Sequence, residues 1–384
     1  MKPKSFMLIA GEASGDLLAA ELVAALREEL PDATFFGAGG SRLSAAGVEL
    51  AFDLTQHAVV GIPSLGRYLK LRDLGRQLLA LAVKRQPDFI IGVDYGGFNL
   101  RFGHSAREYV RDNPFSTWKP KIVQFVSPQV WASRPGRANL LAADYDLLLS
   151  IFPFEKEWYA QRVPRLRVEF VGHPMIGRFA NDELGRPLSP AAAIAKDPPQ
   201  ILLLPGSRKS ELRQHLPSVL AAVKLIQERL PAARARMVLP NPALAQLAKS
   251  LGSTVDVQIG ELPWALSEAD VAIASTGTVT MECAFFGVPT VTIYKKPLLG
   301  LALALGIITV KSFTMPNLLA GGEVYPEFLQ GRLTPENVAQ AALELLQNEA
   351  RRATMRLQLA AVIASLGNPG APNRAAGAIL SLIK

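Results

Sequence analysis

The 384-residue sequence is poor in the residues that most often build covalent cross-links and metal sites. Its one cysteine, Cys283, cannot form a disulfide within the chain, which favours a reducing compartment. The four histidines lack the spacing of metal ligands, so we predict no metal ion and no cofactor. No segment reaches the roughly 20 consecutive apolar residues that a membrane-spanning helix needs.

Common catalytic and nucleotide-binding motifs are missing as well. No G-x-S-x-G elbow or cysteine–histidine pair suggests a covalent nucleophile. The glycine-rich stretch from Gly11 to Asp16 (GEASGD) has the spacing of neither a dinucleotide-binding loop nor a Walker loop. The apolar run before it leads through these glycines into an amphipathic pattern, so we interpret it as a first β-strand and not as a signal peptide.

The charge balance is basic, with a formal net charge of +8. We expect no nucleic-acid partner, because the lysines and arginines are scattered and do not alternate with aromatic residues in a known module pattern. An anionic membrane surface, a phosphorylated substrate or a basic surface without a special partner would each suit this balance. The apolar run 297–310 (PLLGLALALGIITV) has the length of a core helix or of a helix that lies in the membrane interface.

The chain does contain a repeated alternation of strand-like apolar runs and helical patterns, which is typical of parallel sheets covered on both faces. We predict an α/β protein with two Rossmann-like, doubly wound domains, residues 1–177 and 178–384, joined through a breaker-rich segment at 176–200. Such sheets bind ligands beyond the C-terminal ends of their strands, here in a cleft between the domains. The predicted strands are Phe6–Ala10, Phe89–Val93, Ile122–Val126, Leu147–Phe152, Ile201–Leu204, Ala235–Leu239 and Val271–Ala274.

Two loops of the first domain carry candidate functional residues at strand ends. The glycines of the Gly11–Asp16 loop allow close backbone approach, and the helix N-terminus that follows favours an anion or a sugar hydroxyl. A tight structural turn is the other reading of this loop. Asp94 ends the strand in IIGVDYGGFNL, residues 90–100. It can cap the next helix, or it can act as a general base if partial burial raises its pKa.

Two further loops, in the second domain, suit phosphate. In LLLPGSRKSE (202–211), Arg208 follows a strand and could grip a diphosphate at two places, whereas Lys209 fits a solvated helix start. In AIASTGTVTMECAFFGVPTV (272–291), hydroxyl and N–H groups follow a strand and Glu282 could bind a ribose diol. An ordinary capped helix with a solvated glutamate is the alternative. Two such loops in one domain favour a nucleoside diphosphate.

Eight stretches of sequence, in order along nearly the whole chain, carry a family resemblance. They are AGEASGD (10–16), VDYGGFNL (93–100), VSPQVWA (126–132), FPFEKEWY (152–159), VGHPM (171–175), LLPGSRKSE (203–211), GTVTMECAFFGVP (277–289) and MPNLLAG (315–321). The chain resembles the lipid-A-disaccharide synthases, glycosyltransferases of the Gram-negative outer-membrane pathway. The resemblance implies a GT-B fold without a metal ion, with the final helices packed back on the first domain.

Residue roles follow from the same resemblance. The family moves a 2,3-diacylglucosamine unit from UDP to the 6-hydroxyl of 2,3-diacylglucosamine 1-phosphate, with inversion, giving a β-1,6 disaccharide and UDP. The family's base falls on Asp94, and the arginine that stabilises the leaving diphosphate falls on Arg208. The UDP-side positions fall on Thr278, Glu282 and Asn317. The remaining predicted substrate- or UDP-binding residues are Gly11, Ser14, Gly15, Asn99, Gly206, Ser207, Ser275, Thr276 and Gly277.

The implied partners are UDP-2,3-diacylglucosamine, the monosaccharide 1-phosphate and lipids on the cytoplasmic face of the inner membrane, with a homodimer left open. The sequence departs from the family pattern at three places. Tyr95-Gly96-Gly97 replaces the usual Ala-Pro-Asp, Ser133 replaces a tryptophan, and residues 275–278 read Ser-Thr-Gly-Thr. Two alternatives stay open: a catalytically altered paralogue that binds lipid A precursors or membrane, and a GT-B enzyme for another UDP-sugar, such as an epimerase.

Overall fold

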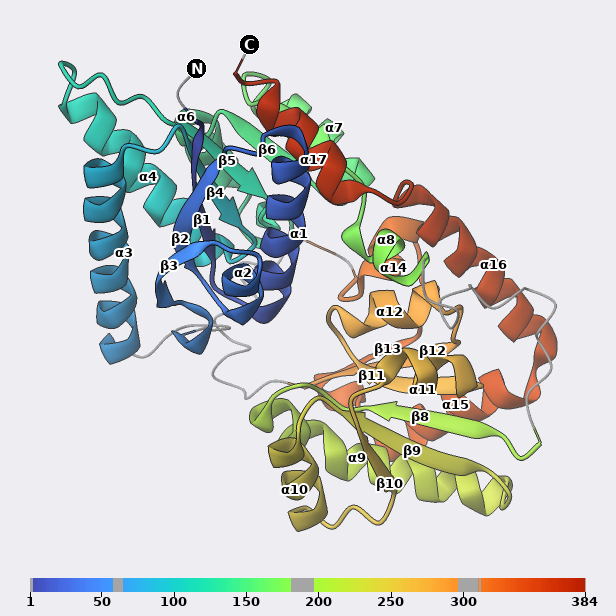
Figure 1. Ribbon diagram of the computed structural model, residues 1–384. Helices are drawn as coiled ribbons and strands as arrows, with labels where there is room; N and C mark the ends of the chain where they lie inside the picture. The colour runs from blue at the N-terminus through green and yellow to red at the C-terminus, as the bar shows by residue number, and fades with distance from the viewer. Residues whose placement is uncertain (1–2, 58–64, 181–196, 296–309, 311, 384) are drawn as a thin grey trace. The chain divides into compact units, whose positions relative to one another are not determined.

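The computed structural model describes residues 3–57, 65–180, 197–295, 310 and 312–383. The chain divides into two compact units, the first made of Met1–Gly177 with Leu366–Lys384 and the second of Arg178–Ser365. Each unit is built around its own parallel sheet, shown in blue to green for the first and yellow to orange for the second (Figure 1). The C-terminal residues therefore belong to the same unit as the N-terminus.

The first unit holds, among its described residues, a seven-stranded sheet in the order β3-β2-β1-β4-β5-β6-β7. All neighbouring strands pair in parallel. The strands are β1 (Ser5–Ala10), β2 (Thr34–Gly39), β3 (Glu49–Asp53), β4 (Phe89–Val93), β5 (Lys121–Phe125), β6 (Leu147–Ser150) and β7 (Val168–Phe170).

Helices cover both faces of this first sheet. In Figure 1, α1 (Ala13–Glu29) and α17 (Ala371–Leu380) lie on one face, and α3 (Leu65–Arg85) and α4 (Gly96–Asp112) lie on the other. Burial on both faces explains why β1 and β4 are almost continuously apolar. The remaining helices are α2 (Ser41–Ala45), α5 (Val130–Ser133), α6 (Ala138–Asp144), α7 (Pro153–Arg162) and α8 (Pro174–Ala180).

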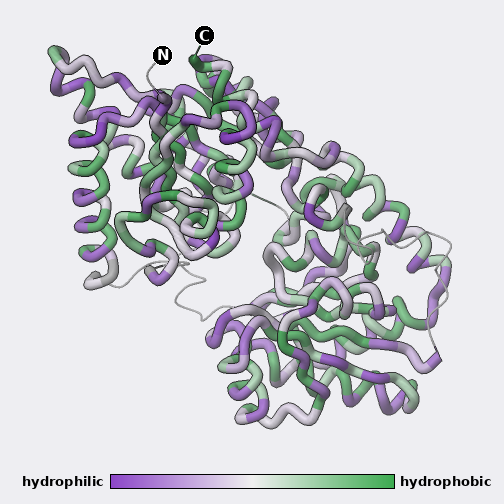
Figure 2. The backbone as a smooth tube through the Cα atoms, viewed as in Figure 1, coloured by the Kyte–Doolittle hydropathy of each residue, from purple (hydrophilic) through white to green (hydrophobic). Residues whose placement is uncertain are grey.

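The second unit repeats the design, with six strands among its described residues in the order β10-β9-β8-β11-β12-β13, also paired in parallel. The strands are β8 (Gln200–Leu204), β9 (Arg234–Leu239), β10 (Asp256–Ile259), β11 (Val271–Ser275), β12 (Thr290–Tyr294) and β13 (Glu327–Leu329). The helices are α9 (Lys209–Arg229), α10 (Pro242–Ser250), α11 (Leu262–Glu268), α12 (Val279–Phe285), α14 (Met315–Ala320), α15 (Pro335–Gln347) and α16 (Glu349–Ser365). Figure 2 shows hydrophobic residues concentrated along the central strands of each unit.

The strand orders place a topological switch point in each sheet. The first strand of each unit lies beside the fourth, β1 beside β4 and β8 beside β11, and the chain winds outward in both directions from there. Loops that leave two such strands diverge to opposite faces, which opens a crevice at the carboxyl ends. The fold therefore predicts a binding crevice at the carboxyl ends of the central strands of each sheet.

The predicted α/β class with two doubly wound parallel sheets is confirmed. All seven predicted strands exist, with ends that differ by at most two residues. The irregular segment predicted from residue 176 begins later, because α8 continues to Ala180; residues 181–196 of that segment lie outside the described residues. The apolar run 297–310 lies outside them except for Val310.

Candidate active site

The predicted site residues of the first unit gather at its switch point. Strand register pairs Ala10 with Val93, so Gly11 and Asp94 follow directly at adjacent strand ends. A Cβ on Gly11 would lie 2.1 Å from Cδ1 of Tyr95, and a Cβ on Gly15 would lie 3.3 Å from Cβ of Asp94. The glycines of the first loop thus leave space for the loop that carries Asp94.

Asp94 sits on a strained piece of backbone. Both it and Tyr95 adopt left-handed conformations, with φ of 51° and 44°, which side chains other than glycine adopt rarely and at a cost of about 1–3 kcal/mol each. Burial raises the pKa of the Asp94 carboxyl, while hydrogen bonds from the Tyr95 N–H and the Ser14 hydroxyl partly oppose this. A carboxylate that binds protons more tightly than usual is a better base near neutral pH.

Two buried amides hold this loop from behind. Asn99, only 1% exposed, donates from Nδ2 to the backbone carbonyl oxygen of Asp94 at 2.8 Å. Gln124 on β5 is fully buried and donates from Nε2 to the same oxygen at 2.9 Å. Asn99 was predicted to bind substrate; the structure places its amide on the backbone carbonyl of Asp94. Gln124 was missed, because one amide inside an apolar strand gives no sequence signal for such a contact.

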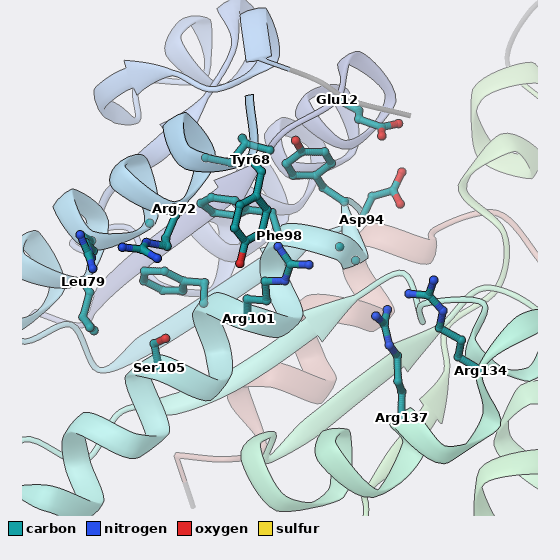
Figure 3. Close-up of a pocket in the computed structure, with 17 residues that line it drawn as sticks. Glu12, Tyr68, Arg72, Leu79, Asp94, Phe98, Arg101, Ser105, Arg134 and Arg137 are labelled. Carbon is teal, nitrogen blue, oxygen red and sulfur yellow. The ribbon is translucent and has the colours of Figure 1, made fainter. Parts of the chain in front are cut away.

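A cavity of about 820 Å³ opens beside Asp94. It runs between α3 and α4, and Glu12 and Asp94 lie at one end of it (Figure 3). Its lining includes five arginines that the sequence analysis did not single out: Arg72, Arg76, Arg101, Arg134 and Arg137. A helical pattern of aromatic and basic residues on α4, Phe98, Arg101, Phe102 and Ser105, was the available signal.

In the second unit, the loop after β8 gathers donors for an anion. Glu211, in the first turn of α9, accepts a hydrogen bond from the Ser207 N–H at 3.0 Å and one from Nη1 of Arg208 at 2.5 Å. Gly206 has φ of 136°, and a Cβ there would lie 2.6 Å from Cβ of Glu211. The carboxylate shows that these two donors converge on an anion at the N-terminus of a 21-residue helix.

His215 links the loop after β8 to the backbone that follows β12. The Lys295 N–H donates to its Nε2 at 3.0 Å, so Nδ1 carries the proton that bonds the Pro205 carbonyl at 2.6 Å. Burial lowers the pKa of His215, which keeps the ring neutral in this role. His215 is fully buried and holds the carbonyl group of Pro205, the residue before Gly206.

The loop after β11 starts beside the first one, because Leu204 pairs with Ala274. Ser275 is buried, whereas Gly277 and Thr278 are exposed. Thr276 is partly exposed, and its N–H bonds the Ile293 carbonyl. Glu282 follows on α12. Burial raises the pKa of Glu282 to about 7, and the charge of Arg178 partly offsets that rise.

The side chain of Asn317 forms hydrogen bonds with the segment between α14 and β13 and with β13 itself. It is 2% exposed, its Oδ1 accepts from the Val324 and Tyr325 N–H groups, and its Nδ2 donates to Glu327 and to the Tyr325 carbonyl. Both the oxygen and the nitrogen of this amide therefore bind other parts of the protein. Most of the predicted residues fall into two sets, one at each switch point, whereas Asn317 lies beside the edge strand β13.

Two features are absent from the described residues. None of their helices has the length and apolar character that crossing a membrane requires. They also contain no group of three or more His, Cys, Asp or Glu side chains arranged to hold a metal ion.

The model of the family described as lipid-A-disaccharide synthetase matches residues 6–379. The chain is 34% identical to the lipid-A-disaccharide synthase of Myxococcus xanthus over 99% of this chain and 98% of that one. It is 36% identical to that of Solibacter usitatus over 98% and 97%. Among solved structures, UDP-GlcNAc 2-epimerase from Neisseria meningitidis bound to UDP-GlcNAc has a TM-score of 0.61 at 12% identity over 99% of both chains. The S. aureus MnaA-UDP co-structure gives 0.64 at 14%, over 99% of this chain and 97% of that one. These neighbours share the GT-B fold.

Proposed function

The chain belongs to the lipid-A-disaccharide synthase family and is a UDP-sugar glycosyltransferase, and we propose that it transfers 2,3-diacylglucosamine from UDP to the 6-hydroxyl of 2,3-diacylglucosamine 1-phosphate with inversion. The observation that carries this proposal is the geometry of Asp94. It is a partly buried carboxylate with a raised pKa, held in a left-handed conformation at a switch point and open to a cavity.

In this reaction Asp94 takes the proton from the acceptor hydroxyl as its oxygen forms the new bond to the anomeric carbon. The bond from that carbon to the diphosphate breaks, and the electron pair leaves with UDP. Arg208 and the Ser207 N–H stabilise the departing charge in place of their contacts to Glu211. Glu282 accepts hydrogen bonds from the ribose hydroxyls.

Asp94→Asn tests the role of the base. The amide keeps the shape of the side chain but cannot accept the proton, so we expect kcat to fall by about 10²–10⁴-fold. UDP affinity, measured by calorimetry, should stay at the wild-type value because the nucleotide contacts lie in the other unit. Asp112→Asn, at the exposed C-terminal end of α4, is the matched control and should keep wild-type turnover.

Two results would contradict the proposal. Wild-type protein that is folded and binds UDP, yet releases no UDP from UDP-diacylglucosamine and the monosaccharide phosphate, would exclude this activity. Turnover of UDP-GlcNAc without any acceptor would instead favour an epimerase, like the fold neighbour from Neisseria meningitidis.

We also propose that the enzyme works at the cytoplasmic face of the inner membrane, since both substrates carry acyl chains. Sedimentation with phosphatidylcholine and phosphatidylglycerol vesicles tests this location. Protein that stays in the supernatant with both kinds of vesicle would contradict it.

A further inference from the structure

The cavity beside Asp94 combines an apolar wall with a cluster of cations. Its walls are the facing sides of two helices, as the spacing of the lining residues shows: Leu71, Gly75 and Leu79 on α3, and Phe98 and Phe102 on α4. The ring of Phe98 stacks with the rings of Tyr95 and Phe102, with distances between ring centroids of 5.8 Å and 6.4 Å. These residues form an apolar wall that leads away from Asp94.

Cations surround the same space. Five arginines and two carboxylates, Glu12 and Asp94, line the cavity, so positive charge is in excess. Figure 3 shows Arg101, Arg134 and Arg137 extending their guanidinium groups toward the same part of the cavity near Asp94. Within the described parts of the chain no ion pair involves any of these three residues.

The charges of Arg101 and Arg134 both act unfavourably on Arg137. The pKa of Arg137 is lowered, first by its burial and then by the charges of Arg134 and Arg101. Arg101 also lies over the ring of Tyr68, with 5.1 Å from Cζ to the ring centroid, which fixes its direction. Because like charges held together cost free energy, such a cluster indicates an anionic ligand and not a structural role.

We propose that Arg101, Arg134 and Arg137 grip the phosphate of the acceptor, whose acyl groups lie along the apolar wall between α3 and α4. This inference rests on the proposed function and assigns residues to its second substrate. The ligand must carry an anion and apolar chains and must present a hydroxyl to Asp94, which a phosphorylated acyl sugar does. Guanidinium groups suit a phosphate because they bind two of its oxygens at once.

The same chemistry could come from the phosphate of a membrane lipid, so the experiment has two arms. The first measures kcat/KM in neutral detergent micelles with the 1-phosphate acceptor and with its dephosphorylated form, for wild type, Arg101→Gln and Arg137→Gln. Wild type should prefer the phosphorylated acceptor, and each variant should lose about tenfold to a hundredfold on that acceptor alone. The second arm measures sedimentation with phosphatidylglycerol vesicles.

Arg111→Gln is the matched control, because it removes the same charge from the same helix outside the cavity, where Arg111 contacts Glu108. It should keep the wild-type preference. Melting temperatures separate function from folding: removing one member of a repelling cluster should leave stability unchanged or raise it, whereas the loss of a structural contact would lower it.

Each result decides the inference. Variants that turn over and keep the wild-type preference for the phosphorylated acceptor overturn it and leave the proposed function standing. Loss of vesicle binding with an unchanged preference assigns the cluster to membrane lipid and also overturns it. A wild-type enzyme that uses neither acceptor overturns the proposed function itself.

Discussion

Gly11→Ala is the substitution that best tests how the first loop supports the base. The new Cβ would lie 2.1 Å from Cδ1 of Tyr95, whereas carbon atoms in contact lie at about 3.5 Å, so the ring must withdraw by about 1.4 Å. Tyr95 is buried against Phe98, and overpacking of this kind costs about 1–3 kcal/mol. Tyr95 is bonded to Asp94, so the carboxylate moves too, and a displacement of about 1 Å can lower the rate about 100-fold.

A double-mutant cycle isolates the contact. Tyr95→Ala removes the ring, so Gly11→Ala should cost less than about 0.5 kcal/mol in that background, in both melting and kcat/KM. Gly66→Ala, on α3 and outside the cavity lining, is the control, because a Cβ there has no atom within 4 Å and should leave activity unchanged. If Gly11→Ala lowers kcat/KM equally in the wild-type and Tyr95→Ala backgrounds, the steric argument fails.

Two further predictions concern protonation. Ser14→Ala removes a hydroxyl that stabilises the ionised form of Asp94, so the pKa of Asp94 should rise and the acidic limb of the kcat/KM profile should move to higher pH; a limb that stays or moves down contradicts the contact. Burial raises the pKa of Glu282 to about 7. Below that pH the carboxyl must lose its proton before it can accept hydrogen bonds from the ribose, so UDP affinity should fall by up to about tenfold for each pH unit below 7. Calorimetry from pH 5.5 to 8 checks this, with Glu282→Gln as the variant expected to lose the dependence.

The sequence predicted the central strands well for a physical reason. β4 and β8, buried on both faces, are continuous apolar runs whose ends are marked by Asp94 and by Pro205-Gly206. Some of the missed strands carry a weaker signal, although β12, which is largely buried, was missed as well. β10 has no buried residue and alternates polar with apolar residues at a sheet edge, and β13 has only three residues, so neither has an apolar run to detect. β2 contains two glycines, which weaken a strand pattern.

The candidate site was predictable only in part. Asp94 and Arg208 stand at strand ends, where the chemistry of a doubly wound fold is concentrated. The roles of Asn99 and His215 depend on backbone atoms far along the chain, such as Lys295 N–H, which no local pattern encodes. The arginine cluster needs α4 and the segment after α5 to meet, and this is a consequence of tertiary packing alone.

The altered Tyr95-Gly96-Gly97 segment bears on whether Asp94 can act as the base that we propose. The groups that position Asp94 act through its carboxylate and its carbonyl oxygen: the Tyr95 N–H, Ser14, Asn99 and Gln124. Of these only Tyr95 lies in the altered segment, and it acts through its backbone N–H, which every residue except proline supplies. Gly97 lines the cavity, so without the family's carboxylate there the arginines face, among the described lining residues, two carboxylates, Glu12 and Asp94. The departure therefore increases the positive charge that the acceptor meets and leaves the support of the base intact, which favours a change in acceptor recognition over a loss of catalysis.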